Sequence, residues 1–460
     1  MRQKIRKIAA VLLAAVIMLC TSGCAEMVGL EAQSLMAPPK TTADRQAIYA
    51  LMSGGEQDVK LVYPRNGEYR SAVISRDLNH DESKEVVSFC MNSEAGGIRL
   101  QFFAQDEKGT WYSLAEFISA ANQVDRVFFG DLTGDGQEEV VIGWGDPLTA
   151  TASISVYRLN ETAVLELPMS VQAYSEMLLT DFDDDTVREL FVLEVAGQPE
   201  EDGTVVAPLG RLFRFDGEQA YVAQTVPLDA AVTRYTAVSF VPVNAWSSAV
   251  VADGVKADGR MMTQVIGYNE AAELLVSPLS NMSAEEPNLT DRAAAVAVAS
   301  RDINGDGRIE IPTAELMQQQ EGSVPDSTGY CVTWNTYSLE DNRFTPLGQS
   351  IVNTAENYFI MLPAGEDRVA CVNDPVTRTA TFFRYTKKDF NGLLVGREDL
   401  FRITVYTDEG WEEHHGGKND DYLLASVAGR AYALTVLDGE LNQNANFQKE
   451  IEEGFKILSE

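Results

Sequence analysis

The stretch FFGDLTGDGQEEVVIGW, from Phe128 to Trp144, decides the fold. It reads as an apolar strand, an acidic bend and a second apolar strand. The same pattern returns three times, as AVISRDLNHDESKEVVSF (Ala72 to Phe89), MLLTDFDDDTVRELFVL (Met177 to Leu193) and VAVASRDINGDGRIEI (Val296 to Ile311). A unit that returns along a chain predicts a repeat architecture, in which each unit covers the apolar face of the next.

The spacing of the bends sets the size of the unit. Counted from the first aspartate of each bend, Asp131 follows Asp77 by 54 positions, Asp181 follows Asp131 by 50, and Asp302 follows Asp181 by 121. The last gap holds about two units, so a unit whose bend has lost its acidic residues is expected near Val241. A unit of this length holds about four short strands, which is the content of one propeller blade.

Between the bends the chain continues as short strands rich in Val, Ile, Phe and Tyr. Helices that could connect parallel strands are missing from the pattern, so antiparallel sheet is expected. We therefore predict an all-β chain, a β-propeller of four-stranded blades with short N- and C-terminal helices. Seven blades are favoured and six are possible. The last blade would combine a hairpin at 422–439 with an N-terminal strand at 59–64, because a closed ring has no exposed sheet edge.

These patterns predict four segments along the chain. They are a signal peptide at 1–23, a lipidated cysteine with a flexible tether and a short helix at 24–56, the β-propeller at 57–440, and a C-terminal docking helix at 441–460. The two helices are predicted from apolar residues at helical spacing. These residues are Ala47, Ile48, Leu51 and Met52 in the first helix, and Phe447, Ile451, Phe455 and Leu458 in the second.

The N-terminus has the three parts of an export signal: the basic MRQKIRK, an apolar run from Ile8 to Leu19, and the small-residue stretch TSGC. The apolar run is shorter than the roughly 20 residues that a membrane-spanning helix needs. Ser22 and Gly23 before Cys24 resemble a bacterial lipobox, and this resemblance implies that Cys24 becomes the lipidated first residue. The protein would then sit on the extracytoplasmic face of the cell membrane, held by its lipid alone. The alternative is an ordinary signal peptide cleaved nearby.

The excess of acidic over basic residues argues against some classes of binding partner. The chain has 36 basic and 69 acidic residues, which gives a net charge of −33. Nucleic acids and anionic lipid surfaces both require a positive patch on the protein. We therefore expect no nucleic-acid partner and no membrane contact apart from the lipid.

The acidic bends follow the spacing D-x-[DNT]-x-D-x-x-x-E, with candidate ligands at positions 1, 3, 5 and 9. Calcium takes six to eight oxygen ligands, which closely spaced carboxylates, carbonyls and water supply. A glycine at position 6 allows the bend a left-handed conformation, and the bends of Asp131 and Asp302 have it. The candidate ligands are Asp77, Asn79, Asp81 and Glu85; Asp131, Thr133, Asp135 and Glu139; Asp181, Asp183, Asp185 and Glu189; and Asp302, Asn304, Asp306 and Glu310.

An EF-hand and an Asx-type turn are the alternatives to a calcium-binding bend between two strands. An EF-hand places its bidentate glutamate at position 12 between two helices, whereas these bends lie in β-rich surroundings with glutamate at position 9, so the EF-hand is disfavoured. In an Asx-type turn the carboxylates accept backbone amides and hold no ion. Either a calcium bend or an Asx-type turn would fix the link between two strands.

The four quoted units resemble the FG-GAP or VCBS-type repeats of integrin-like β-propellers. In that family such bends bind calcium between two strands of a blade, and the ion is structural. The resemblance implies a calcium-stabilised propeller. The chain departs from the family in lacking glycine at position 6 of two bends and in its ligand-free units near Val241 and Asn357.

The sequence contains few motifs that are typical of enzymes. The chain has three histidines; His80 is inside a bend, and His414 with His415 lies in the polar segment WEEHHGGKND, which is expected to be an exposed loop. The sequence contains no zinc helix, nucleophile elbow or phosphate-binding loop. We therefore favour a cell-surface binding or scaffold module for a protein or a glycan. The alternative is a surface polysaccharide hydrolase or lyase with carboxylates at the propeller channel.

Overall fold

The computed structural model describes residues 43–54, 59–92, 96–146, 151–160, 163–195, 207–243, 247–269, 272–278, 289–316, 330–363, 368–389, 393–416 and 421–458. The predicted signal peptide and Cys24 with its tether lie outside these residues. Within them, six antiparallel sheets of four or five strands make up the fold. The prediction of an all-β chain built from four-stranded sheets, with a short helix near each end, is confirmed.

The first four sheets are meanders, in which strands pair in chain order. The first sheet has β1 (Val73–Arg76), β2 (Glu85–Met91), β3 (Ile98–Gln105) and β4 (Trp111–Ser119). The second has β5 (Gln123–Gly130), β6 (Glu139–Asp146), β7 (Thr151–Leu159) and β8 (Val164–Leu167). The third has β9 (Glu176–Thr180), β10 (Glu189–Glu194), β11 (Leu209–Phe215) and β12 (Ala220–Pro227). The fourth has β13 (Val232–Pro242), β14 (Ser248–Lys256), β15 (Met261–Asn269) and β16 (Leu274–Val276).

The last two sheets have five strands each. The fifth has β17 (Ile311–Leu316), β18 (Tyr330–Ser338), β19 (Arg343–Asn353) and β20 (Tyr358–Met361), and β26 (Phe455–Ile457) is added to β20. The sixth has β21 (Val369–Asp374), β22 (Thr379–Lys388) and β23 (Leu394–Thr407), followed in space by β25 (Arg430–Val436) and then β24 (Tyr422–Val427). The helices are α3 (Ala43–Ser53), α4 (Asp408–Gly416) and α5 (Ala445–Gly454), with short 3-10 turns η2 (Ala294–Val296) and η4 (Leu441–Gln443).

Consecutive sheets pack face to face through buried apolar residues, as blades do. The strands β2, β10 and β14, each the second of its sheet, are buried almost throughout. Aromatic pairs cross the joints: Phe89 with Trp144 between the first two sheets, and Phe182 with Phe240 between the third and fourth. Burying one large apolar side chain contributes about 1.5–3 kcal/mol. These contacts therefore stabilise the packing of each sheet on the next.

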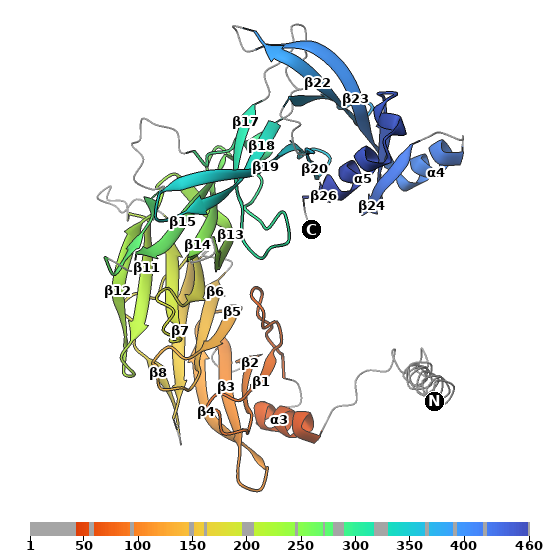
Figure 1. Cartoon of the computed structure of the whole chain (residues 1–460). Coiled ribbons are helices and arrows are strands. Elements are labelled where there is room, and N and C mark those ends of the chain that lie inside the picture. Colours follow the sequence, from red (N-terminus) through yellow and green to blue (C-terminus); the bar gives the residue numbers. More distant parts are fainter. Residues whose placement is uncertain are drawn as a thin grey trace, which may run out of the picture.

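The sheets form a curved row, and the first and sixth lie at its two ends (Figure 1). At one end, α3 covers the first sheet with Ile48 and Met52 against Cys90 and Phe103. The expected closing strand at 59–64 instead pairs with β2 through the Leu61–Cys90 bridge, and the hairpin of β24 and β25 belongs to the sixth sheet. The prediction that these two segments combine into a last blade is therefore wrong. The described residues form six sheets, and the favoured number of seven is not confirmed.

The C-terminal helix is shorter than the sequence predicts. Its Phe447 and Ile451 are buried against the fifth and sixth sheets, as expected of a docking helix. The helix ends at Gly454, and the alternation of buried Phe455, exposed Lys456 and buried Ile457 continues as a strand. That strand pairs with β20 and covers an edge that would otherwise be free.

Two strand predictions in the second half of the chain are also corrected. The ligand-free unit expected near Asn357 is split, since β20 belongs to the fifth sheet and β21 begins the sixth. The segment before the Asp302 bend is irregular between η2 and a single bridge from Arg301 to Glu310. In this segment the amide of Ser300 donates to Asp253 of β14 at 2.8 Å, which ties the segment to the fourth sheet.

Candidate metal centres

The four acidic bends share one hydrogen-bonding pattern. The first-position aspartate accepts amides inside the bend; Asp302, for example, accepts those of Gly305 at 2.6 Å and Gly307 at 2.8 Å. The fifth-position aspartate accepts the amide two residues further on, as Asp306 does from Arg308 at 2.9 Å. The corresponding bonds in the other bends are made by Asp77 and Asp81, by Asp131 and Asp135, and by Asp181 and Asp185. These are the bonds of an Asx-type turn, and they fix the path of the backbone.

Two positions of every bend are left-handed, not the single one expected from the sequence. Positions 4 and 6 are glycines in the bends of Asp131 and Asp302. In the other two bends the same φ angles are taken by His80 (58°) and Glu82 (70°), and by Asp184 (55°) and Thr186 (75°). A left-handed residue other than glycine costs about 1–2 kcal/mol. The two bends without glycine therefore have the same shape at a higher conformational cost.

The ninth-position glutamate is the buried centre of each bend. Glu139 and Glu310 are fully buried, and each accepts the amide of the second bend residue, Leu132 at 2.8 Å and Ile303 at 3.0 Å. Glu85 and Glu189 make the same bond. Burial raises the pKa of all four carboxyl groups, and it raises that of Glu139 to about 7. An ionised glutamate in such a place requires a nearby cation.

In two bends an arginine from the next strand of the sheet supplies this positive charge. The Arg214 guanidinium lies 2.8 Å from Oε1 of Glu189 and 2.5 Å from Oδ2 of Asp183. Arg158 lies 2.5 Å from Asp135, and its Nε is 3.7 Å from Glu139. Sequence reasoning missed both arginines, because they come from the next strand of the sheet and not from the bend.

The register of each sheet determines which residue stands opposite the ninth-position glutamate. Pairing of Leu190 with Phe213 places Arg214 opposite Glu189. The four residues in this position are, in chain order, Ala104, Arg158, Arg214 and Thr336. The bends of Asp77 and Asp302 thus have no arginine at this position.

In the Asp181 bend three carboxylates lie close together. One oxygen each of Asp181, Asp183 and Asp185 lies within 4.8 Å of the others, which is a spacing that a hard cation can bridge. In the Asp302 bend, Oε1 of Glu310 is buried without a hydrogen-bond partner. The donor set there consists of carboxylate and amide oxygens, which is the chemistry that calcium prefers.

The bends also join neighbouring sheets. The amide of Glu138, next to the ninth position, donates to the carbonyl of Leu78 in the preceding bend at 2.8 Å. Arg188 donates to the carbonyl of Asp131 in the same way at 2.7 Å. Arg76 of β1 adds an ion pair to Glu138. Each of these bends therefore contacts the bend before it, so that the acidic bends connect one blade to the next.

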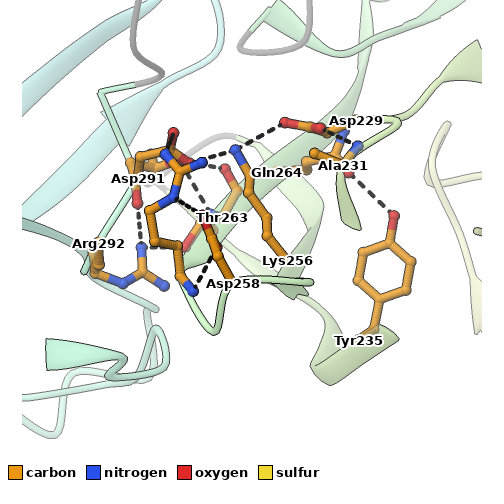
Figure 2. Close-up of polar contacts among 11 residues, drawn as sticks. Asp229, Ala231, Tyr235, Lys256, Asp258, Thr263, Gln264, Asp291 and Arg292 are labelled. Atoms are coloured by element: carbon orange, nitrogen blue, oxygen red, sulfur yellow. Dashed lines mark hydrogen bonds and ion pairs between the residues drawn. The ribbon is translucent and has the colours of Figure 1, made fainter. Parts of the chain in front are cut away.

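The fourth sheet, where the sequence predicts a unit without acidic residues, has a different polar centre. Arg292 is fully buried and bonds to Asp253 at 3.0 Å. Beside it, Lys256 lies between Asp229 and Asp291, at 3.4 and 2.7 Å (Figure 2). These charges are paired inside the protein. They tie the segment after β16 to β14 and β15.

The histidine pair is not in an exposed loop, as the sequence had suggested, but on α4. Nε2 of His414 lies 2.5 Å from Asp421, and its ring stacks on Tyr406. His415 stacks on Trp411. The stacking of His414 on Tyr406 holds α4 against β23.

The comparisons with known proteins give little further information. No protein-family model matches the chain, and no curated protein matches it. Among solved structures, the Dos1 propeller is similar at 10% identity and a TM-score of 0.28 over 65% of this chain; the chain spans 66% of that propeller, just under two thirds. A protein from Lactobacillus plantarum is similar at 10% identity and a TM-score of 0.26, over 70% of this chain and 82% of that one. Likenesses this low assign neither a family nor a function.

No helix within the described ranges is long and apolar enough to cross a membrane.

Proposed function

We propose that the protein is a lipid-anchored, extracytoplasmic module of the β-propeller type that is stabilised by calcium and presents its loops to a protein or a glycan. The observation that carries the proposal is the joint role of the acidic bends. They share one backbone path, they bury a glutamate, and three of them lie in consecutive sheets and contact one another. Repeated contacts of this kind fix neighbouring sheets against one another, so that the loops between the strands can form a rigid surface.

Calcium is the cofactor that these bends fit best. The donors are carboxylate and amide oxygens, and extracellular sites of this kind have dissociation constants of about 10⁻⁴ to 10⁻³ M. A cation at the bend would neutralise the buried glutamate. The measurement is the melting temperature of the full chain in a chelator and in millimolar calcium. We expect a rise with calcium, and an unchanged temperature contradicts the calcium part of the proposal.

The anchor is proposed from the N-terminal sequence, with Cys24 as the lipidated residue. The Cys24→Ser variant should be released from the membrane fraction and should no longer incorporate labelled palmitate. Incorporation that continues in this variant contradicts the assignment.

The binding role is proposed because the bends join neighbouring sheets and bury their ninth-position glutamates within the fold. Apart from the four glutamates of the bends, the carboxyl group whose pKa is raised is that of Glu176; burial raises it, and Arg126 is paired with it at 2.6 Å. A hydrolase needs acids that converge on a substrate. The test is a glycan array and a pull-down with the full chain, and turnover of a polysaccharide would favour the hydrolase or lyase over the binding module.

A further inference from the structure

We propose that the acidic bends use two kinds of counter-ion: a built-in guanidinium in the Asp181 bend, and a bound divalent cation in the Asp302 bend. The second half of this statement rests on the proposed calcium binding and names the bend that takes the ion. The first half stands on the geometry of Arg214 alone. Each half therefore has its own test.

In the Asp181 bend the position of a cation is already filled. Arg214 Nη2 contacts Oδ2 of Asp183 and Oε1 of Glu189, which are at positions 3 and 9 of the bend. The other oxygen of Asp183 has no hydrogen-bond partner, but its carboxylate is already paired through Oδ2. An ion held between Asp183 and Glu189 would have to displace the guanidinium. Because Glu189 is almost fully buried, displacing the guanidinium would also break its ion pair with this carboxylate, which is unfavourable.

Among the described residues of the Asp302 bend, no cation occupies the same place. Arg301 pairs with Glu310 through the backbone, but its guanidinium donates to the carbonyl of Leu458 and lies over the Phe359 ring. Thr336 stands where Arg214 stands in the third sheet, and its hydroxyl donates to the carbonyl of Thr345 at 3.4 Å. Oε1 of Glu310, the counterpart of the oxygen that Arg214 contacts, is buried without a partner in a side chain that is 0% exposed. A buried carboxylate oxygen without a donor costs about 1–3 kcal/mol or more, so a ligand is needed to offset this cost.

The charges around the Asp302 bend favour a cation as this ligand. Asp302, Asp306 and Glu310 all belong to the bend, and Arg308 approaches Asp306 only at 3.9 Å, with both side chains about 40% exposed. An exposed pair of this kind contributes little. A hollow of about 560 Å³ lies beside Asp302 and Asn304, and the cationic Arg301 and Lys456 also line it.

The Asp131 bend belongs with the arginine type, although its pairing is less direct. Arg158 bonds to Asp135 and to the carbonyl of Gly217, and only its Nε approaches Glu139. In the Asp77 bend Ala104 stands opposite Glu85 on β3, and Arg76, opposite Glu85 on β1, is paired with Glu138. No partnerless buried oxygen marks this bend as a site. We therefore assign the cation site to the Asp302 bend alone.

The site is tested by calorimetric titration of the full chain with calcium chloride. We expect Glu310→Gln, which keeps the shape of the side chain, to lower the stoichiometry by one ion or to weaken one site by more than about tenfold. Thr336→Arg places a guanidinium opposite Glu310 and should have the same effect. If both variants are folded by circular dichroism and bind calcium as the wild type does, the Asp302 site is wrong even though calcium binding stands.

The guanidinium is tested by Arg214→Met, which keeps the apolar stem and removes the charge. We expect this variant to bind one more calcium ion than the wild type, because the Asp181 bend is then open. Arg211→Met is the matched control: Arg211 is on the same strand and pairs with Glu194 outside the bend, so its variant should gain no ion. A folded Arg214→Met that gains no ion overturns the built-in counter-ion.

A wild type that binds no calcium at all removes both the proposed cofactor and the Asp302 site. Arg214→Met still decides the other half in that case, since opening the Asp181 bend either creates a calcium site or does not.

Discussion

The bends of Asp181 and Asp302 follow the same backbone path with opposite chemistry. The Asp181 bend has no glycine at its two left-handed positions, and it has an arginine against its buried glutamate. The Asp302 bend has glycine at both positions and Thr336 in place of an arginine opposite Glu310, and one oxygen of Glu310 is left without a partner. The motif therefore determines the shape of the bend, whereas its counter-ion is determined by a residue on the next strand.

The largest effect is expected from pH in the Asp131 bend, where Arg158 lies closer to Asp135 than to Glu139. Burial raises the pKa of Glu139 to about 7 from its ordinary value of 4.5. Below pH 4.5 the folded and unfolded chains are both protonated at this residue. Between pH 4.5 and 7 the unfolded chain has released the proton and the folded chain retains it, so stability falls as the pH rises through this window. The loss is on the order of 3 kcal/mol.

This prediction is checked by urea unfolding in a chelator across that pH range. Glu139→Gln should remove the part of the slope that comes from this residue. A slope that is the same in the wild type and in the variant means that Arg158 already neutralises Glu139, which would make the Asp131 and Asp181 bends equivalent.

The next effect is the loss of the guanidinium from the Asp181 bend. Arg214→Met leaves Glu189 and Asp183 without their cation. Removing one partner of a fully buried pair costs about 3–5 kcal/mol, and because the Arg214 side chain is 34% exposed we expect about 2 kcal/mol. Urea unfolding in a chelator measures the loss. Millimolar calcium should recover part of it in this variant and none in Arg211→Met.

A smaller effect is expected from calcium in the wild type. With a dissociation constant of about 10⁻³ M, a calcium concentration of about 10⁻² M stabilises the folded chain by about 1.4 kcal/mol. In Glu310→Gln the part of the calcium response that comes from this site should be absent. A response of full size in that variant would place the ion in another bend.

The smallest effect comes from backbone conformation. Thr186 is β-branched and has a φ of 75°, so Thr186→Gly relieves strain while it also makes the unfolded chain more flexible. We expect a net stabilisation of about 0.5–1 kcal/mol, measured as a higher melting temperature. The reverse change, Gly307→Thr at φ 81°, should destabilise the Asp302 bend by a larger amount. Loss of stability in Thr186→Gly would mean that the threonine makes a contact that outweighs its strain.

The sequence predicts most of what is local in these structures. The alternation of apolar residues on both sides of each bend predicts the hairpins, and the D-x-[DNT]-x-D-x-x-x-E spacing predicts which side chains fill the bend. It does not predict Arg158 or Arg214. They follow the glutamates Glu139 and Glu189 by 19 and 25 positions, because the loops between the paired strands differ in length. No fixed spacing could have found them.

What depends on packing between distant segments was predicted less well. The hairpin at 422–439 has the pattern of a new blade, but β25 pairs with β23 and extends the sixth sheet. The strand at 59–64 has the pattern of a closing strand, but Leu61 pairs with Cys90. The alternation of apolar residues shows which face of a strand is buried, but not which edge it joins, and so the number of blades could not be read from it.

The most direct test is a crystal structure of the full chain grown in calcium, with the ion located by its anomalous signal. The account predicts an ion in the Asp302 bend that contacts Asp302, Asp306 and Oε1 of Glu310, and it predicts Arg214 in the Asp181 bend with no ion beside it. An ion in the Asp181 bend with Arg214 turned away, or an Asp302 bend without an ion at saturating calcium, would contradict it.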